Sequence, residues 1–181
     1  YLHRTTERMA VRGLRGGGPN LMAYGSNIPI GSVAYASVGT NTTDIAGQLW
    51  VTDIIVPANM VVSSIGFLQG GTATTDNTLV AIFDGAGNRL GTSNLSGVVL
   101  SGASSFQEQA LLTPVQLFGP ARYFVAVQGN GTAAGAIQTI PTATFVGVIA
   151  GVIAGAFGTV PAKINPPTTF TAGSGPIVYL K

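Results

Sequence analysis

From Gln48 onward, the chain consists of short apolar runs that are separated by turns rich in Gly, Pro and Asn. The apolar runs occupy residues 49–56, 60–68, 78–83, 106–112, 122–128 and 177–180. A further strand is expected to begin at Arg89, because residues 84–88 have the glycines of a hairpin turn. No long amphipathic helix competes with this pattern. The sequence therefore predicts an all-β fold, an antiparallel β-sandwich of at least seven strands.

Alternation along each strand indicates which side chains form the core, because successive residues of a strand point to opposite faces. Tyr123 and Phe124 are neighbours, so we expect one to point inward and the other outward, where it could bind a ligand. The expected core consists of Trp50, Ile54, Val56, Ile65, Phe67, Val80, Ile82, Phe106, Leu111, Phe124 and Ala126.

Composition excludes several kinds of chemistry. The absence of Cys rules out disulfides, thiol nucleophiles and Cys-ligated metals. His3 is the one histidine and lies near a chain end, so a Ser-His-Asp triad or a multi-histidine metal site is not expected. The acids of the body, such as Asp84, are interpreted as solvated turn or strand-edge residues in preference to calcium ligands. We therefore expect no enzyme activity, no cofactor and no metal.

The chain is also poor in charge. Its 181 residues include only 8 Lys and Arg and 6 Asp and Glu, whereas 26 are Gly, and about a quarter of residues are charged in a typical protein. The length suits a single packed domain. A surface made of small polar residues and glycine is suited to burial against neighbouring molecules.

Residues 1–45 are expected to form an extended arm, because glycine and proline recur too often for regular structure. The first fifteen residues have a net charge of +3, and residues 16–181 have a net charge of −1. A basic arm can dock on an acidic protein, bind nucleic acid or remain a solvated tail. Docking on a protein is favoured over nucleic acid, because only Tyr1 could stack on bases. The arginines expected to dock are Arg4, Arg8, Arg12 and Arg15, and residues 46–181 are expected to form the sandwich domain.

The segment 145–158 repeats the sequence Gly-Val-Ile-Ala and is the most apolar part of the chain. It could be a buried strand or loop at the core or a subunit interface, a membrane or pore element, or a helix within the domain. The first interpretation is favoured, because the apolar stretch 143–160 lies between Pro141 and Pro161 at the lower length limit for a membrane span. Each glycine would also cost a helix about 1 kcal/mol relative to Ala. The predicted oligomer interface consists of Phe145, Val146, Val148, Ile149, Val152, Ile153 and Phe157.

Three segments together resemble a known type of module. They are the strand and turn at 80–90, the run Phe106-Gln107-Glu108, and the strand at 119–127 with its Gly-Pro-Ala-Arg-Tyr-Phe start. Their order resembles a β-sandwich module of viral structural proteins. With the arm and the nearly uncharged body, the chain resembles the jelly-roll decoration (cement) proteins of tailed bacteriophage capsids, over about residues 47–130.

This resemblance implies a jelly-roll fold and a structural protein of the virion. The protein would sit on the capsid surface as a homotrimer or another cluster of copies, bind the major capsid protein, and reach neighbouring subunits with its arm. Neither nucleic acid nor a membrane is an expected partner. The alternative is a glycan-binding module or a fibre or spike sandwich, although the sequence lacks the row of exposed aromatic residues that would favour glycan binding.

Overall fold

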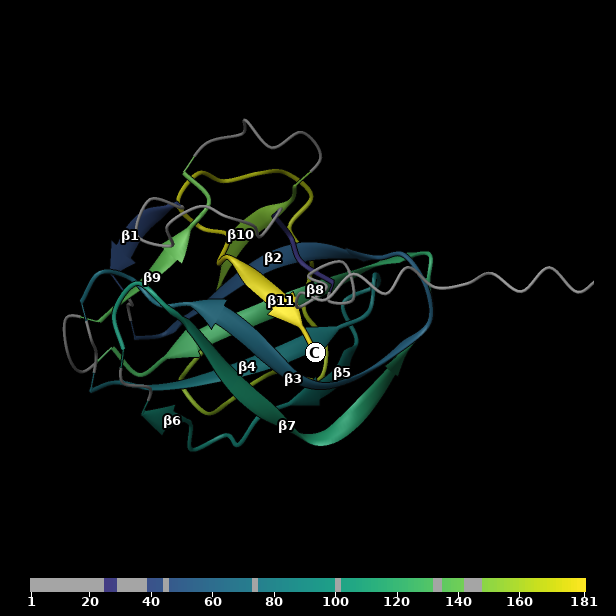
Figure 1. Cartoon of the computed structure of the whole chain (residues 1–181), viewed down its shortest axis with the longest axis horizontal. Coiled ribbons are helices and arrows are strands. Elements are labelled where there is room, and N and C mark those ends of the chain that lie inside the picture. Colours follow the sequence, from purple (N-terminus) through teal and green to yellow (C-terminus); the bar gives the residue numbers. More distant parts are fainter. Residues whose placement is uncertain are drawn as a thin grey trace, which may run out of the picture.

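The computed structural model describes residues 25–28, 39–43, 46–72, 75–99, 102–131, 135–141 and 148–181 (Figure 1). Within these ranges the regular structure is entirely β, and all the strand pairs are antiparallel. The strands are β1 (Thr40–Thr43), β2 (Gln48–Val56), β3 (Met60–Leu68), β4 (Asn77–Phe83), β5 (Arg89–Thr92), β6 (Val98–Val99), β7 (Phe106–Leu117), β8 (Ala121–Gly129), β9 (Ala136–Thr139), β10 (Ala150–Ala154) and β11 (Val178–Leu180). The predicted all-β sandwich is confirmed.

The strands form three sheets. The largest sheet has the order β10-β2-β8-β4-β5, and β6 also pairs with β4. A three-stranded sheet, β11-β3-β7, packs against one face of the largest sheet, and β1 pairs with β9 in a small third sheet. Each main apolar run of the sequence has thus become a strand, and the runs of β2, β4 and β8 are buried along most of their length.

Two pairs of strands are nested. β2 pairs with β8 in the large sheet, and β3, which follows β2, pairs with β7, which precedes β8. The two connecting turns touch, since the Gly119 N–H donates to Asn59 Oδ1 at 3.0 Å. A Cβ on Gly119 would lie 2.5 Å from the backbone nitrogen of Ala58, so only glycine allows this approach. The antiparallel pair β2–β8 therefore continues through the two turns into the antiparallel pair β3–β7. This double-stranded segment passes from the large sheet into the three-stranded sheet, as in Greek-key sandwiches.

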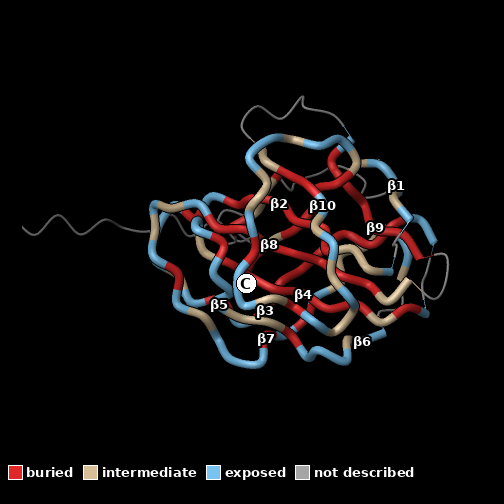
Figure 2. Tube along the Cα trace, turned by 180° about the vertical axis from the view of Figure 1, so that it is seen from behind, coloured by how far each residue is buried: buried red, intermediate tan, exposed pale blue. Residues whose placement is uncertain are grey.

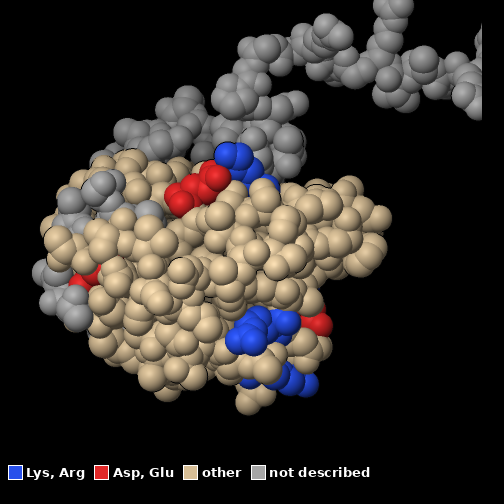
Figure 3. Space-filling view, turned by 90° about the horizontal axis from the view of Figure 1, so that it is seen from below, with Lys and Arg blue, Asp and Glu red and all other residues tan. Residues whose placement is uncertain are grey.

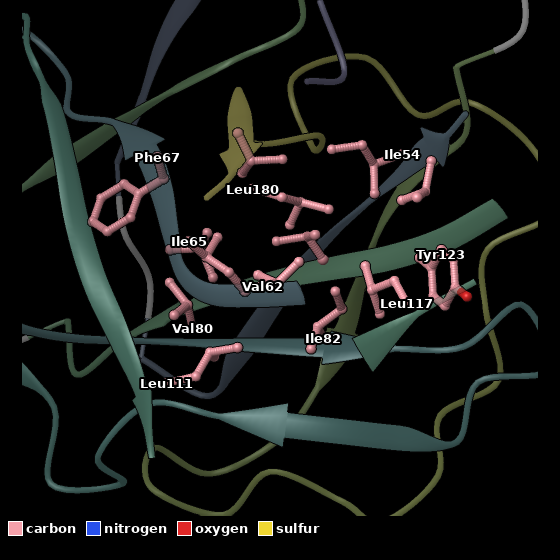
Figure 4. Close-up of a cluster of buried hydrophobic side chains, with 14 of the residues drawn as sticks. Ile54, Val62, Ile65, Phe67, Val80, Ile82, Leu111, Leu117, Tyr123 and Leu180 are labelled. Atoms are coloured by element: carbon pink, nitrogen blue, oxygen red, sulfur yellow. The ribbon is translucent and has the colours of Figure 1, made fainter. Parts of the chain in front are cut away.

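The main core lies between the two larger sheets (Figure 4). Side chains from β3, β7 and β11 meet side chains from β2, β4 and β8 there. Eight of the eleven predicted core residues belong to this cluster, namely Trp50, Ile54, Val56, Ile65, Phe67, Val80, Ile82 and Leu111. Phe106 is a correction, because it is only half-buried and packs at the side of a smaller cluster that includes Leu68 and Ile177.

A second core covers the opposite face of the large sheet. Val160 and Ile164, from the segment that follows β10, pack there against Phe83, Phe124 and other residues of β2, β4 and β8. Figure 2 shows these central strands as buried along most of their length. The expectation that only one of Tyr123 and Phe124 points inward is therefore wrong. Tyr123 lies in the first core and Phe124 in the second.

Two parts of the expected arm belong to the sandwich. Residues 39–43 contain β1, which pairs with β9, and residues 25–28 run alongside β11. Asn27 fastens the second part, since its Nδ2 donates to Thr52 Oγ1 at 3.0 Å and to the Pro176 carbonyl at 2.7 Å. Within the expected arm, Thr40–Thr43 thus form a regular strand, and residues 25–28 are irregular but bonded to the sandwich.

Candidate interaction surface

The predicted oligomer interface is only partly described, since Phe145 and Val146 lie outside the described residues. The rest contains β10, an edge strand antiparallel to β2. The strand interpretation of the repeat is confirmed for Ala150–Ala154, of which Ala150 and Gly151 are buried and Val152 and Ala154 are exposed, and a helix is wrong there. Within the described ranges, no helix is long and apolar enough to cross a membrane.

The side chains of this segment face mostly into the protein. Ile149, Ile153 and Phe157 pack against the second core, and Val148 packs against the cluster of Leu68 and Ile177. Val152 alone among the predicted residues that are described is exposed. A role of this segment between subunits stays a prediction, and its main contacts are within the chain.

The outer edge of β11 and the beginning of the outer edge of β10 are covered by the chain itself. The Thr171 N–H donates to the Ala150 carbonyl at 2.9 Å. On β11, the Leu180 N–H donates to the Gly25 carbonyl at 2.7 Å, and the Asn27 N–H donates to the Val178 carbonyl at 3.3 Å. We call β10, β11 and these covering segments, 25–28 and 170–171, the closed side of the sandwich.

Asp53 fixes the start of β10. Its side chain is only 4% exposed, and its Oδ1 accepts the Ile149 N–H at 2.8 Å. Its Oδ2 lies 3.2 Å from Arg122 Nε in an ion pair. Burial raises the pKa of Asp53, and the hydrogen bond from Ile149 and the charge of Arg122 lower it by less. This carboxylate therefore holds backbone in place, and its bonding needs are met within the chain.

Glu108 on β7 forms a polar cluster on the outer face of the three-stranded sheet. Ser64 Oγ donates to its Oε1 at 2.8 Å, Tyr179 OH donates to its Oε2 at 3.1 Å, and Lys181 Nζ contacts both oxygens at 3.1 and 3.2 Å. Burial raises the pKa of Glu108, but these hydrogen bonds and the Lys181 charge outweigh it, so the net pKa is lowered. The cluster joins all three strands of this sheet.

Two aromatic rings lie beside this cluster. Phe106 and Tyr179 pack edge to face with ring centroids 5.1 Å apart. The Tyr179 ring lies over Gly66, where a Cβ would be 2.2 Å from the ring. The sequence pattern did not predict this pair, because the partners are far apart along the chain.

Asp84 behaves as the turn residue that the sequence predicts. Its Oδ1 accepts the N–H groups of Ala86 and Asn88 at 2.9 and 2.8 Å. Burial raises the pKa of Asp84, but the hydrogen bonds from Asn88 and Ala86 and the charge of Lys163 outweigh it and lower the pKa. In the part of the chain that the structure describes, His, Cys, Asp and Glu nowhere gather in threes that could hold a metal ion.

The opposite side of the sandwich, which we call the open side, is formed by β6 and β7. Among the described strands, β7 ends the three-stranded sheet, and β6 lies outside β4 at the end of the large sheet. β5, next to β6, is partly covered, because the Arg89 N–H donates to the Ala162 carbonyl at 2.9 Å. The two edges are joined through Thr78. Its Oγ1 receives a hydrogen bond from Gln109 Nε2 of β7 at 2.8 Å and donates to the Val98 carbonyl of β6 at 3.3 Å.

The open side is apolar and nearly free of charge. Between Arg89 and Arg122, Glu108 is the only charged residue of the sequence. The same interval holds six of the nine large hydrophobic residues that are exposed in the described ranges, namely Leu90, Leu95, Val98, Val99, Leu112 and Phe118. Figure 3, which views the molecule from below Figure 1, where β6 and β7 lie, shows a broad uncharged surface with a few small groups of charged atoms. Sequence reasoning missed this surface, and the long interval without charge was the available signal.

The arginines Arg4, Arg8, Arg12 and Arg15 lie outside the described residues, so the structure does not place them. No known protein family, curated protein or solved structure matches this chain. What the structure shows is an all-β protein whose antiparallel sheets pack as a sandwich, with a closed side and an open side as defined above.

Proposed function

We propose that this chain is a structural protein of the virion that decorates the outside of a bacteriophage capsid and stabilises it. The observation that carries this proposal is the exposure of six large apolar side chains in the sequence interval between Arg89 and Arg122, which holds one charged residue, Glu108. Large exposed apolar patches mark interaction sites in folded proteins. The resemblance to jelly-roll decoration proteins supports the same function, and the nested pairing of β2 with β8 and β3 with β7 supports the jelly-roll fold.

The mechanism needs no catalytic residue. A protein that binds only the assembled shell stabilises it by mass action, in proportion to its affinity and concentration. In this proposal the body forms a homotrimer and contacts the major capsid protein, and the arm with Arg4, Arg8, Arg12 and Arg15 docks on acidic surface of a neighbouring subunit. The protein is then located on the capsid surface, without nucleic acid, membrane or cofactor.

Immunogold electron microscopy tests this proposal. An antibody raised against the purified chain is applied to phage particles that are concentrated from the culture encoding it. We expect gold spread over the shell. Gold confined to fibres or spikes, or particles without gold, would overturn the proposal, and particles treated with pre-immune serum provide the control.

A glycan-binding or fibre module is the second candidate, and the Phe106–Tyr179 pair favours it. Sugars stack on aromatic rings, and this pair lies next to the hydrogen-bonding groups of Glu108 and Lys181. Against it, both carboxylate oxygens of Glu108 already accept hydrogen bonds within the chain. Binding of the purified chain to a glycan array would favour this candidate if Tyr179→Ala abolished the binding, whereas an array without signal would exclude it for the glycans displayed.

A further inference from the structure

We propose that the open side is the surface through which copies of this chain bind one another. This inference rests on the self-association within the proposed function and names the strands that carry it. The predicted interface at Ile149, Ile153 and Phe157 packs mostly inside the protein, so another surface has to provide most of the contact.

The first argument is the strand edges. On the closed side, segments of the chain itself cover strand edges, since residues 25–28 and 170–171 hydrogen-bond to the backbones of β11 and β10. Within the described residues, no strand is added outside β7 or β6. An unpaired edge is a template for a strand of another molecule. Pro114 lacks an N–H group, so a backbone ladder on β7 is expected along the part before it.

The second argument is the side chains on these strands. Val98 and Val99 of β6 are 45% and 51% exposed, and Leu112 of β7 is 68% exposed. Their neighbours Ala110, Thr113 and Pro114 are exposed and uncharged. Burying such apolar groups is favourable by roughly 25 cal/mol for each Å² removed from water. Side chains of this kind are typical of interface cores, from which charged residues are depleted.

The third argument identifies the occupant as a second copy. A strongly charged surface repels its own copy, and it needs a partner of opposite charge. The open side has one charged residue, Glu108, and Lys181 of the same chain neutralises it at 3.1 Å. The surface can therefore meet itself without repulsion, and it carries no charge pattern that would select a different partner.

The open side is also held rigid before any partner binds. Gln109 is buried and joins β7 to Thr78 of β4, which in turn bonds β6. Gly91 of β5 lets β7 pack closely, because a Cβ there would lie 2.7 Å from the Val115 side chain. A preorganised surface loses less conformational entropy on association.

Solution mass tests the inference. Light scattering is measured over a series of concentrations for the full chain, for the double variant Val99→Lys with Leu112→Lys, and for the control Ile55→Lys with Val61→Lys. The control residues are similarly exposed, at 53% and 59%, but belong to β2 and β3. All four side chains are exposed, so the fold is expected to survive, and circular dichroism with urea unfolding checks this.

We expect a mass of two or more chains for the parent and the control. The open-side variant should associate at least about 30-fold more weakly, as when central interface residues are lost. The inference is overturned if the parent is a single chain at every concentration. It is equally overturned if the open-side variant keeps the parent's mass, or if the control dissociates to the same extent.

The outcome is separable from that of the proposed function. A parent that self-associates but gives no gold on particles leaves this inference standing and removes the decoration function. A parent that labels shells but stays a single chain in solution removes this inference and the homotrimer of the proposed function, and it leaves the decoration of the capsid standing.

Discussion

The two sides of the sandwich differ in whether the backbone groups at their strand edges are hydrogen-bonded within the chain. On the closed side, residues 25–28 cover β11 and residues 170–171 cover part of β10, so backbone groups at both edges are bonded within the chain. On the open side, β6 and β7 end their sheets without a further described strand, and their side chains are apolar and exposed. Closure of one side stabilises the domain, and the open side leaves apolar surface for another molecule.

The largest expected difference between the two sides is in the unfolding free energy lost when a leucine of each side is replaced by alanine. Leu180 of β11 is fully buried in the main core, and Leu112 of β7 is exposed. Leu180→Ala should lower the free energy of unfolding by about 2–5 kcal/mol, because it leaves a cavity. Leu112→Ala should change it by less than about 0.5 kcal/mol. Urea unfolding, followed by the fluorescence of the buried Trp50 at a concentration where the protein is a single chain, measures both values. Equal effects would contradict the comparison.

The second test removes the residue that fastens the closed side. Asn27 donates two side-chain hydrogen bonds, and its Oδ1 accepts the Val178 N–H at 3.0 Å. Asn27→Ala leaves these partners unsatisfied and should cost about 1–3 kcal/mol of unfolding free energy. The matched control is Asn59→Ala, which removes one exposed bond, to the Gly119 N–H, and should cost less. A loss for Asn27→Ala no larger than that for Asn59→Ala would show that the chain closes this side without the asparagine.

Asp53 and Glu108 should give the stability of the protein opposite pH dependences. Asp53, which holds the start of β10, tests the closed side. Its pKa in the folded protein is raised above the ordinary 3.8, so the folded state keeps the proton longer than the unfolded state. Stability should therefore fall as the pH rises from about 3.8 through the raised pKa. In Asp53→Asn, the amide oxygen can still accept the Ile149 N–H and this fall should be absent. Urea midpoints at a series of pH values measure it, and an unchanged pH profile would refute the role of burial at Asp53.

For Glu108 on β7, stability should rise with pH instead of falling, and this is the smallest of the expected effects on stability. Its folded pKa lies below the ordinary 4.5, so its stabilising contribution is present above that value and is lost as the pH falls through the folded pKa. Glu108→Gln should thus lower stability at neutral pH, by less than about 1 kcal/mol because the ion pair with Lys181 is partly exposed. In strong acid, the variant and the parent should unfold at the same urea concentration. A deficit that persists in acid would mean that packing, and not the charge, is lost.

Much of the fold could be predicted because strands are specified locally. The run 49–56 became β2 (Gln48–Val56), the run 60–68 became β3, and the turn at 84–88 joins β4 to β5. Alternation also placed Trp50, Ile54 and Phe67 in the main core. One error concerns the face of the large sheet on which Phe124 lies. Phe124 was expected to share a core with Trp50, but Val160 and Ile164, from a segment with no regular pattern, cover a second face of the large sheet.

The candidate surface was harder to predict than the fold. The repeat at 145–158 is predicted to be an interface because it is strongly apolar, and the structure places its described part mainly against the protein's own second core. The sequence pattern does not predict the open side, since Val98, Val99 and Leu112 occur in short runs like those of buried strands. Apolar sequence alone does not distinguish a buried strand from an exposed one.

The sequence by itself determined that this protein is all-β, where most strands begin and end, and that its surface carries little charge. Those properties depend on side-chain alternation, turn residues and composition, which act within a few residues along the chain. Only the tertiary structure decided which sheet faces are covered and which edges are closed. Asn27 on Pro176 and Phe170 beside Ala150 join residues that are distant in sequence, and their contacts form only when the sheets pack together.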